Sequence, residues 1–446
     1  MPAIITNKIK KQFLQSVYNE AQDSANDYYI GIGRSEDWDS SDTAPTPINR
    51  ERDEKLFRHS LQSVKLVTAY SFVVPRYNWT SGTVYNAYND NVSGQPSVSY
   101  YIITDENKVY TCIRQGKDAN GVAIVSTIKP DHTDTSLNPE TDGYVWKYLY
   151  TVTTSDANNY LTANFFPVKF VDSAAPVDAD FQQYVIQNSA VPQQIVGYRV
   201  TSAGTGFTSD PTITIVGDGS GARARAVVTT TGIIGAIEVD DSAGGFPLGT
   251  GYTQANVTIS GGGGTGATAV PIYGPKAGLG ADPRDDLRSV AMMFNIKPTG
   301  REQGDFVIGN DFRQIGLIRN PTLYDSDEQF TETQGRALRA MSLSSVSGTF
   351  AEDDIIVGGT STARAVIDYY NDSSELWYHQ NEDTGFIAFI DGEGVSTSTG
   401  SATADSAAIA PEVDPYSGDL LYIDNRTQAI TRSAQQTEDI KIVIQL

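Results

Sequence analysis

The stretch Thr141-Asp142-Gly143-Tyr144-Val145-Trp146-Lys147-Tyr148-Leu149-Tyr150 carries an aromatic side chain at every second position. Successive side chains of a β-strand point to opposite faces of the sheet, so the four rings are predicted to line one face. They are Tyr144, Trp146, Tyr148 and Tyr150. A ladder of this kind buries a large area, and we expect it to anchor the core of its domain. A stacking platform for sugars or bases is the functional alternative.

The composition predicts a β-rich protein with several domains. The chain has 446 residues, among them 40 Gly and 24 Tyr, and Thr, Ser and Val are plentiful. Such residues favour strands and turns over helices. At about 150 residues per domain, the length suggests roughly three domains. We therefore predict a mainly β fold of the β-rich α+β class, in which antiparallel sheets form sandwich or barrel-like domains with a few N-terminal helices.

Shifts in composition suggest where the chain is divided. Two islands, 190–273 and 342–410, are rich in Gly, Thr, Ser, Ala and β-branched residues and are predicted to be β-domain insertions. The second island includes a low-complexity run, Ser396 to Ser406, which we predict to be an exposed loop. The remaining predicted parts are 1–175, an N-terminal α+β domain around the aromatic strand; 274–341, the first part of a β core domain; and 411–446, strands that complete that core.

The first island contains an internal repeat. Gly204-Thr205-Gly206-Phe207-Thr208 recurs as Gly249-Thr250-Gly251-Tyr252-Thr253. Two copies are too few for a solenoid or a propeller, which need at least about three. One small β domain with internal pseudo-symmetry is therefore predicted. Two further pairs recur in the same order: Thr212-Ile213-Thr214-Ile215 with Asn256-Val257-Thr258-Ile259, and Gly219-Ser220-Gly221-Ala222 with Gly264-Thr265-Gly266-Ala267.

The charge and the cysteine content exclude several classes of protein. The formal net charge is -22, so the surface repels phosphate backbones and anionic lipids. No apolar run reaches the ~18 residues of a membrane span, and the N-terminus lacks the apolar core of a signal peptide. The single cysteine, Cys112, excludes an intramolecular disulfide. We expect neither nucleic acid nor membrane as a partner, and assembly in a reducing cytoplasm.

The sequence contains no clear catalytic motif. The three histidines, His59, His132 and His379, are scattered and form neither a His-Glu-x-x-His motif nor a Cys/His cluster. The Gly-rich runs at 217–221 and 261–266 lack the Lys-Ser/Thr of a phosphate-binding loop, and tight turns explain them better. We therefore expect a protein that is not an enzyme and that has no catalytic residues, no cofactor and no transition metal.

Two acidic loops are the remaining candidates for a metal. Asn89-Asp90-Asn91 and Asp325-Ser326-Asp327-Glu328 could hold calcium weakly, but neither has the full spacing of a calcium-binding hand. Solvated loops are the favoured interpretation.

Five motifs resemble, in the same chain order, those of a baseplate wedge subunit of contractile-tailed phages of the T-even type. That family has Gly-Arg-Ser-x-x-Trp, Pro-Arg-x-x-Trp, Asp-Gly-Tyr-Val-Trp-x-Tyr-Leu, Phe-Arg-Gln-Ile…Asn-Pro and a terminal Glu-Asn-Arg…Gln-Thr-Glu-Glu-Ile. The resemblance covers about 1–175, 275–325 and 415–446, and neither island. The matching segments are Ile30-Gly31-Ile32-Gly33-Arg34-Ser35-Glu36-Asp37-Trp38, Val74-Pro75-Arg76-Tyr77-Asn78-Trp79, Asp142-Gly143-Tyr144-Val145-Trp146-Lys147-Tyr148-Leu149, Phe312-Arg313-Gln314-Ile315 with Asn320-Pro321, and Asp424-Asn425-Arg426 through Gln436-Thr437-Glu438-Asp439-Ile440.

The resemblance implies a structural, dimer-forming subunit of the virion. Such a subunit would lie in the wedges around the tail hub, contact other wedge proteins, and help to transmit the rearrangement that triggers sheath contraction. The family provides no catalytic residues. Aromatic and Arg side chains carry much of the energy of large interfaces, although packing and loop anchoring within one domain is an equal alternative for the motif residues. The structural or interface candidates are Arg34, Trp38, Arg76, Trp79, Tyr144, Trp146, Tyr148, Arg313 and Arg426.

Two other functions stay open. A host-binding adhesin could contact glycans through the insertions, on exposed aromatic side chains such as Trp377, Tyr378 and Phe386. A glycan-degrading tail enzyme would need two carboxyl groups about 5–10 Å apart in a cleft.

Overall fold

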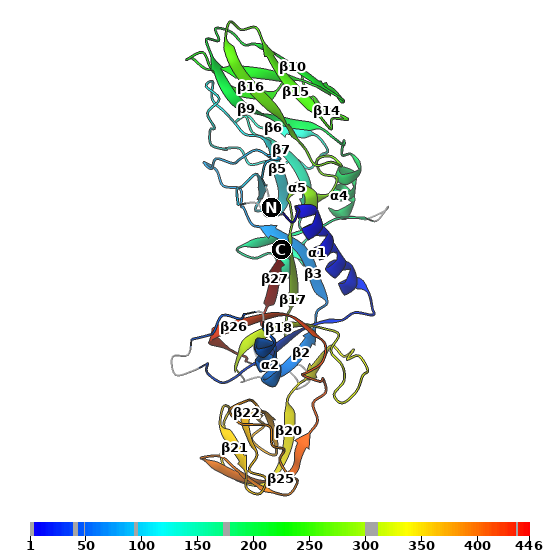
Figure 1. The fold of residues 1–446 in the computed structure, drawn as a ribbon, viewed down its shortest axis with the longest axis vertical. Helices are drawn as coiled ribbons and strands as arrows, with labels where there is room; N and C mark the ends of the chain where they lie inside the picture. The colour runs from blue at the N-terminus through cyan, green and yellow to red at the C-terminus, as the bar shows by residue number, and fades with distance from the viewer. Residues whose placement is uncertain are drawn as a thin grey trace. The chain divides into compact units, whose positions relative to one another are not determined.

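The computed structural model of the protein describes residues 4–38, 43–48, 50–92, 97–172, 179–298, 311–433 and 436–446 (Figure 1). Strands account for 43% of the chain and helices for 11%, which confirms the prediction of a mainly β fold with antiparallel sheets and few helices. The helices are α1 (Asn7–Gln22), α2 (Glu51–His59), α3 (Thr154–Tyr160), α4 (Ala179–Asn188) and α5 (Pro283–Asp286).

The chain forms two compact units, each assembled from several segments. Unit 1 consists of Met1–Gln15, Ser71–Met293 and Val443–Leu446, and unit 2 consists of Ser16–Tyr70 and Phe294–Ile442. The limits of the five parts predicted from composition stay predictions.

The aromatic stretch forms a central strand of a four-stranded antiparallel sheet in unit 1. The strand order is β4-β5-β7-β6, and β7 carries Trp146 and Tyr148. Tyr144 and Trp146 are fully buried and stack at 5.8 Å between ring centroids. The strands are β4 (Tyr101–Ile103), β5 (Lys108–Arg114), β6 (Leu137–Pro139) and β7 (Val145–Thr151). We call the cluster of Tyr85, Ile102, Tyr110, Cys112, Tyr144, Trp146, Tyr148 and Ile186 the aromatic core.

The prediction that all four rings share one face is wrong for Tyr150. On β5, the consecutive residues Val109 and Tyr110 pair with Tyr150 and Tyr148, which are two positions apart. Paired residues lie on the same face and consecutive residues on opposite faces, so Tyr148 and Tyr150 point to opposite faces. Tyr150 is buried separately, and its hydroxyl donates to the Pro167 carbonyl at 2.7 Å.

A second antiparallel sheet has the order β27-β17-β3-β8. All six residues of β17 are buried, which agrees with its Met- and Phe-rich sequence. The strands are β3 (Ala69–Pro75), β8 (Phe165–Val168), β17 (Ala291–Ile296) and β27 (Ile440–Gln445).

The repeat segment of unit 1 folds into four antiparallel strand pairs, drawn in green in Figure 1. The pairs are β9-β16, β10-β15, β11-β14 and β12-β13. The strands are β9 (Ile195–Thr205), β10 (Thr212–Gly217), β11 (Ser220–Ala222), β12 (Ala224–Val228), β13 (Ile234–Val239), β14 (Leu248–Thr250), β15 (Ala255–Ser260) and β16 (Thr265–Tyr273).

The pairing gives the sequence repeat a pseudo-twofold symmetry. Thr205 pairs with Thr265, and their repeat equivalents Thr250 and Ser220 pair with each other. The central strands β10 and β15 are also equivalents, and they pair around Thr214 and Thr258. Each copy of the repeat therefore completes the other, and neither copy could form these ladders alone.

One glycine in each copy makes room for the aromatic ring of the other copy. A Cβ on Gly264 would lie 2.4 Å from the Phe207 ring, and one on Gly219 would lie 2.5 Å from the Tyr252 ring. The recurrence of Gly at these positions thus has a packing cause in addition to turn formation.

Gly264→Ala should therefore destabilise the repeat segment by about 1–3 kcal/mol, because the new methyl group forces a buried ring to move. Gly197→Ala on β9 is the matched control, since its Cβ would meet only ordinary contacts at 3.6 Å or more. Urea unfolding of both variants measures the difference, and equal stabilities would contradict the packing role.

Unit 2 contains a five-stranded antiparallel sheet in the order β19-β2-β1-β18-β26. Gly31 of β1 pairs with Gly316 of β18, and the Phe57 ring of α2 packs over the gap that they leave. A Cβ on Gly316 would lie 2.4 Å from that ring. Acidic residues in the first turn of α2 and basic residues in its last turn complement the helix dipole. The strands are β1 (Tyr28–Gly33), β2 (Leu61–Leu66), β18 (Asp311–Arg319), β19 (Gln334–Arg336) and β26 (Asp419–Thr431).

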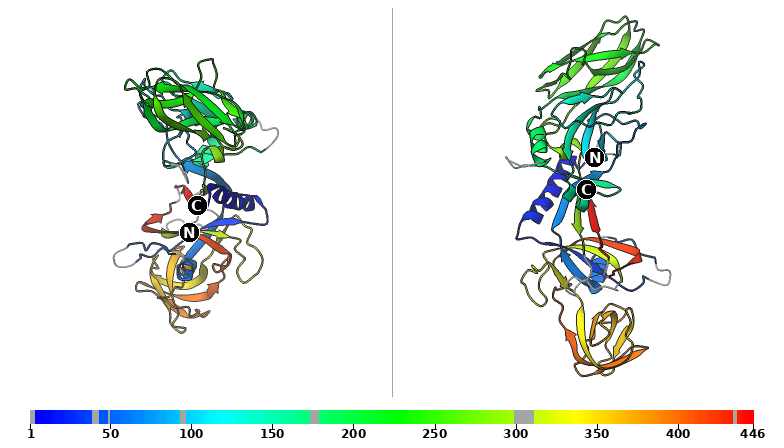
Figure 2. Two further views of the ribbon diagram at one scale, coloured as in Figure 1. Left: turned by 45° about the horizontal axis from the view of Figure 1, so that its top comes forward. Right: turned by 180° about the vertical axis from the view of Figure 1, so that it is seen from behind.

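Unit 2 also contains a closed six-stranded barrel in the order β20-β23-β22-β21-β24-β25, drawn in yellow and orange in Figure 2. Closure pairs every strand on both sides and leaves no open edge. Its interior is filled mainly by aliphatic residues, with small alanines where strands approach closely. The strands are β20 (Arg339–Gly348), β21 (Ile355–Gly358), β22 (Arg364–Tyr370), β23 (Glu375–His379), β24 (Gly394–Ser396) and β25 (Gly400–Ile409).

The prediction of an exposed loop from Ser396 to Ser406 is wrong, because most of this run is strand β25. Ala402 and Ala404 are 7% and 0% exposed, while the residues between and beside them face outward. The run alternates with period two, and its interior side chains are small because they fill a narrow barrel.

Candidate functional site

The Gly-Arg-Ser-x-x-Trp motif forms a compact turn at the end of β1. Arg34 has a φ of +62°, a conformation that non-glycine residues seldom adopt. This turn places its guanidinium 4.2 Å from the centroid of the Trp38 ring and 3.7 Å from Glu36 Oε1. Arg34 Nη2 also donates to the Asp37 carbonyl at 2.8 Å. The motif is thus held by its own charged and aromatic side chains.

Two other motifs meet this turn. The buried Arg313 of β18 donates to the Ser35 carbonyl and forms an ion pair with Asp37. The Trp38 indole donates to the Arg426 carbonyl on β26 at 2.7 Å. We call this assembly the Arg34–Arg313 network. Four of the predicted candidates therefore lie together in unit 2, brought from three separate segments of the chain: Arg34, Trp38, Arg313 and Arg426.

Arg313→Lys should destabilise unit 2 by roughly 1–3 kcal/mol, because lysine keeps the charge but cannot reproduce the planar fork that reaches Ser35 and Asp37 together. Arg426→Lys is the matched control. The Arg426 side chain is 52% exposed and, among the residues that the structure describes, pairs with Asp424 at 2.7 Å, so its replacement should cost about 0.5 kcal/mol or less. Chemical denaturation of the two variants tests this, and a larger loss for Arg426→Lys would refute it.

The other five candidates lie in unit 1 and contact their own domain. Trp79 is half-buried against the aromatic core and donates to Ser126 Oγ at 3.2 Å. Arg76 donates to the Thr162 carbonyl and to Asn78 Oδ1, both at 2.8 Å. The contacts of these two side chains are those of packing and loop anchoring within the unit. The three remaining candidates, Tyr144, Trp146 and Tyr148, belong to the aromatic core.

A buried ionic triad adjoins the Arg34–Arg313 network. His379, at the end of β23, has its Nδ1 at 2.7 Å from Asp368 Oδ2 on β22 and its Nε2 at 3.5 Å from Glu36 Oε1. Gln62 Nε2 donates to the other Asp368 oxygen at 3.2 Å. The imidazole therefore lies between two carboxylates. A Ser-His-Asp site needs a hydroxyl at the second nitrogen, and here a carboxylate takes that place.

Burial and mutual charge set the pKa of each member of this triad. Burial alone would lower the pKa of His379, but Asp368 and then Glu36 outweigh it and raise that pKa to about 10. Burial alone would raise the pKa of Glu36, but His379 and then Arg34 lower it to about 2. Burial keeps the pKa of Asp368 above its usual range despite His379. His379 is therefore a cation at neutral pH; its charge favours the ionised form of Glu36 and, against burial, that of Asp368.

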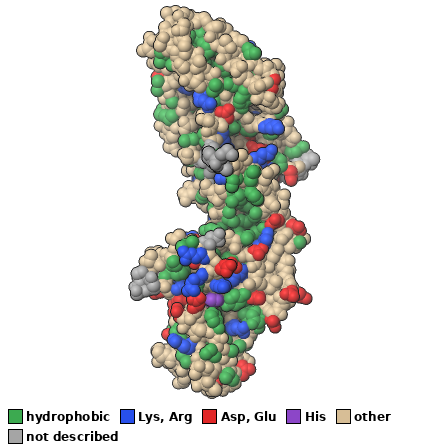
Figure 3. Space-filling model, viewed as in Figure 1, with side chains coloured by type: hydrophobic (Ala, Val, Ile, Leu, Met, Phe, Trp, Pro, Cys, Tyr) green, Lys and Arg blue, Asp and Glu red, His purple; other side chains and the backbone are tan. Residues whose placement is uncertain are grey.

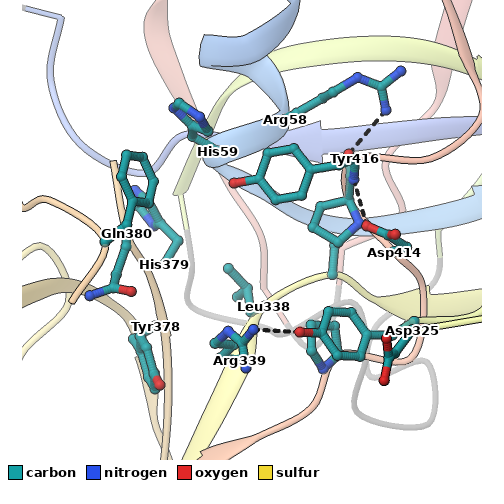
Figure 4. A pocket seen from close by; sticks show the side chains of 15 residues that line it. Arg58, His59, Asp325, Leu338, Arg339, Tyr378, His379, Gln380, Asp414 and Tyr416 are labelled. Carbon is teal, nitrogen blue, oxygen red and sulfur yellow. Dashed lines mark hydrogen bonds between the residues drawn. The ribbon is translucent and has the colours of Figure 1, made fainter. Parts of the chain in front are cut away.

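A cavity of about 410 Å³ opens beside His379, entirely within unit 2 (Figure 4). We call it the Tyr416 cavity. Besides His379, five aromatic side chains line it: His59, Tyr324, Tyr378, Phe386 and Tyr416. Four charged side chains besides His379 also line it: Arg58, Asp325, Arg339 and Asp414.

Arg58 fixes one wall of the Tyr416 cavity. Its guanidinium donates to the carbonyls of Pro415, Ser417 and Gly418 at 2.6–3.0 Å and pairs with Glu54 at 2.8 Å. The side chain is only 6% exposed, so these bonds hold the turn that carries Tyr416 in one position. His59 follows Arg58 and packs edge-on against Phe386 and Tyr416, at 4.9 and 5.9 Å between centroids.

The exposure of the aromatic side chains corrects part of the adhesin hypothesis. Trp377 and Tyr378 are 7% and 2% exposed, because they lie on β23 between two paired strands and point into separate cores. They offer no open ring face for a sugar. Phe386 and Tyr416 are 55% and 54% exposed. The structure therefore places the open rings at the Tyr416 cavity.

The described residues give no support to a metal site. No group of three or more His, Cys, Asp or Glu side chains among them is placed to hold a metal ion. In the first acidic loop, Asn89 accepts from the Asn91 N–H and Asp90 accepts from the Tyr273 N–H, so protein donors use these oxygens. In the second, Asp325 and Glu328 are exposed. Solvated or protein-bonded loops explain both.

Within the described part of the chain, no helix is long and apolar enough to cross a membrane. Acidic and basic side chains are interspersed over the face in Figure 3. Comparison with protein-family models and with curated protein sequences finds no match for this chain. The functional argument therefore depends on the site itself and on the sequence motifs.

Proposed function

We propose that the protein is a structural subunit of the baseplate wedge in a contractile phage tail, and not an enzyme. One observation carries the proposal. The residues of the five motifs gather in space in two groups, one within each unit. Three motifs contribute Arg34, Arg313 and Arg426 to one network, and the other two contribute Trp79 and Trp146 to one core.

This arrangement supports a structural role because the motif residues are used to fix the shape of each unit. Their side chains bond to backbone carbonyls and pack against rings, which positions strands and loops that are distant in sequence. A subunit that transmits force between partners needs such rigid units. The proposed partners are other wedge proteins and a second copy of the chain, with assembly in the host cytoplasm and a final place in the virion.

Gold-labelled antibody microscopy on intact phage particles tests the proposal. Serum raised against this protein should place gold at the plate at the distal end of the tail, and mass spectrometry of disrupted particles should find the chain. Gold along fibres or spikes would favour an adhesin, and absence of the chain from purified particles would refute a virion role.

A host-glycan adhesin is the second candidate. The observation that favours it is the pair of half-exposed rings, Phe386 and Tyr416, at the edge of one cavity. Aromatic faces of this kind stack on the apolar faces of sugars. Binding of the full chain to a glycan array, lost in Phe386→Ser, would support it.

A further inference from the structure

We propose that the Tyr416 cavity is a docking site for an extended segment of a partner protein that presents a carboxylate beside a large apolar side chain. This inference deepens the proposed structural function and rests on it, because it names the chemistry by which unit 2 would hold a partner. The cavity volume of about 410 Å³ lies within the range of about 300–1,000 Å³ that is typical of binding pockets.

Arg339 supplies the charge that a carboxylate would meet. Its guanidinium donates to the Tyr324 hydroxyl and lies 5.3 Å from the centroid of that ring. Its charge also acts on the Tyr378 and Tyr416 phenols, lowering their pKa against the dominant effect of burial. Among the residues that the structure describes, no Asp or Glu oxygen lies within 4.0 Å of it. The remaining N–H groups of a planar guanidinium suit a carboxylate.

Two further apolar side chains close to Phe386 in the chain are exposed, although neither lines the cavity. Ile387 and Ile390 follow Phe386 and are 55% and 49% exposed. At the cavity itself, the exposed rings of Phe386 and Tyr416 together with Arg339 match the composition of protein interface centres. A partner side chain placed between Phe386 and Tyr416 would cover this surface.

The polar groups of the wall favour a peptide over a sugar. Sugars are recognised through several free donors and acceptors, but most of those here are already bonded within the chain. Arg58 donates to three backbone carbonyls, Gln380 Nε2 donates to two at 2.8 Å, and Asp414 accepts from the Tyr416 N–H. Among the described residues, Arg339 keeps donors available, whereas the exposed Asp325 would repel a carboxylate, so the acid of the ligand would have to lie at Arg339 and away from Asp325. The wall therefore offers one basic group with spare donors beside two open rings, which fits a peptide segment that presents an acid next to an apolar side chain.

The wall that carries Tyr416 is also held in place before binding. Arg58 ties the turn at residues 415–418 to α2, and His59 supports both open rings. Ordering side chains on binding costs about 0.5–1.5 kcal/mol each, so a preformed wall preserves affinity. The site is therefore built to accept a ligand without reorganisation of this turn.

The test selects binders from a display library of random 12-residue peptides on the purified full-length chain. We expect the selected peptides to share an Asp or Glu next to a large apolar residue. Their affinity, measured by fluorescence anisotropy, should fall at least tenfold in Arg339→Leu and in Phe386→Ser. Arg364→Leu, which removes an exposed arginine on β22 outside the cavity, should change it less than twofold.

Changing the peptide itself keeps the test valid if a variant folds poorly. Replacing the peptide's acid by its amide should cost the wild-type chain the same tenfold, and should cost Arg339→Leu nothing further. In Arg339→Glu, a peptide with Lys in place of the acid should bind better than the original. Melting temperatures of all variants check folding.

Two results would overturn the inference. One is selection of peptides without an acid, or of peptides that bind Arg339→Leu and wild type equally. The other is cavity-dependent binding on a glycan array with no peptide selected, which would assign the site to sugars. Gold at the baseplate with no peptide binding would remove the docking site and leave the structural role. Peptide binding by a protein that is absent from purified particles would keep the docking site and remove the structural role in the virion.

Discussion

Trp146→Ala should lower the free energy of unfolding of unit 1 by roughly 3–5 kcal/mol. The indole is completely buried, stacks on Tyr144 and meets the Tyr85 ring edge-on at 5.6 Å between centroids. Its removal takes away both the largest side chain of the aromatic core and the partner that its neighbours pack against. Other members of the core are held by their own hydrogen bonds, such as the Tyr144 hydroxyl to the Ile124 carbonyl, so the space cannot close by collapse.

Urea unfolding followed by far-ultraviolet circular dichroism measures the loss. Two units can unfold in separate steps, so each transition is fitted by itself. Trp79→Ala is the matched control, because it deletes the same side chain from a half-buried position at the edge of the core. Trp79→Ala should lower the free energy of unfolding clearly less than Trp146→Ala does. Trp146→Phe, which keeps a ring in the core, should lower it less than Trp79→Ala does. An unchanged transition in Trp146→Ala would refute the assignment of this stretch to the core.

The sequence could predict the aromatic core because its signal is local. A period of two over Tyr144 to Tyr150 identifies a strand, and the density of rings predicts burial. The position of Tyr150 could not be predicted in the same way. It depends on a register shift against β5, and the register of a pair is a property of two strands.

The repeat segment and the run from Ser396 to Ser406 show what local sequence patterns can and cannot predict. The repeat at 204–267 is visible in the sequence, and its pseudo-symmetry follows once Thr205 is seen to pair with Thr265. The prediction of a loop from Ser396 to Ser406 is wrong because Ala, Ser and Thr differ little in hydrophobicity, so a strand of these residues shows no clear alternation. Ala404 is fully buried because it faces the interior of the closed barrel, and the barrel cannot be recognised from this run alone.

For the candidate site, the motifs predicted which residues matter but not what they contact. Arg34 and Arg313 are 279 positions apart and belong to different motifs, and antiparallel pairing of β1 with β18 brings them together. The His379 triad has no sequence signature, since Asp368 and His379 meet through the pairing of β22 with β23, and Glu36 comes from the turn after β1. A scattered histidine gave no reason to expect a buried cation.

That buried cation leads to the second large effect, which is a loss of stability in unit 2 as the pH rises from about 6.5 to about 10. His379 titrates near 6.5 when unfolded and near 10 when folded. Between these values the folded protein binds the extra proton, so the free energy of unfolding falls with pH. The contribution is complete below about pH 6.5. Each pH unit in this window can remove up to about 1.4 kcal/mol, which amounts to several kcal/mol over the window.

His379→Gln removes this contribution, and it also removes the charge that lowers the pKa of Glu36 and of Asp368, so these two carboxyls titrate at higher pH in the variant. The stability difference between wild type and His379→Gln should be largest at pH 5.5–6.5 and should shrink steadily toward pH 10, since the wild type loses its ion pairs there. His59→Gln is the control. Burial lowers the pKa of His59, so it is uncharged across this window and its replacement should leave the pH slope unchanged. If wild type and His379→Gln lost stability in parallel, His379 would carry no buried charge, and the triad would be held together by neutral hydrogen bonds instead.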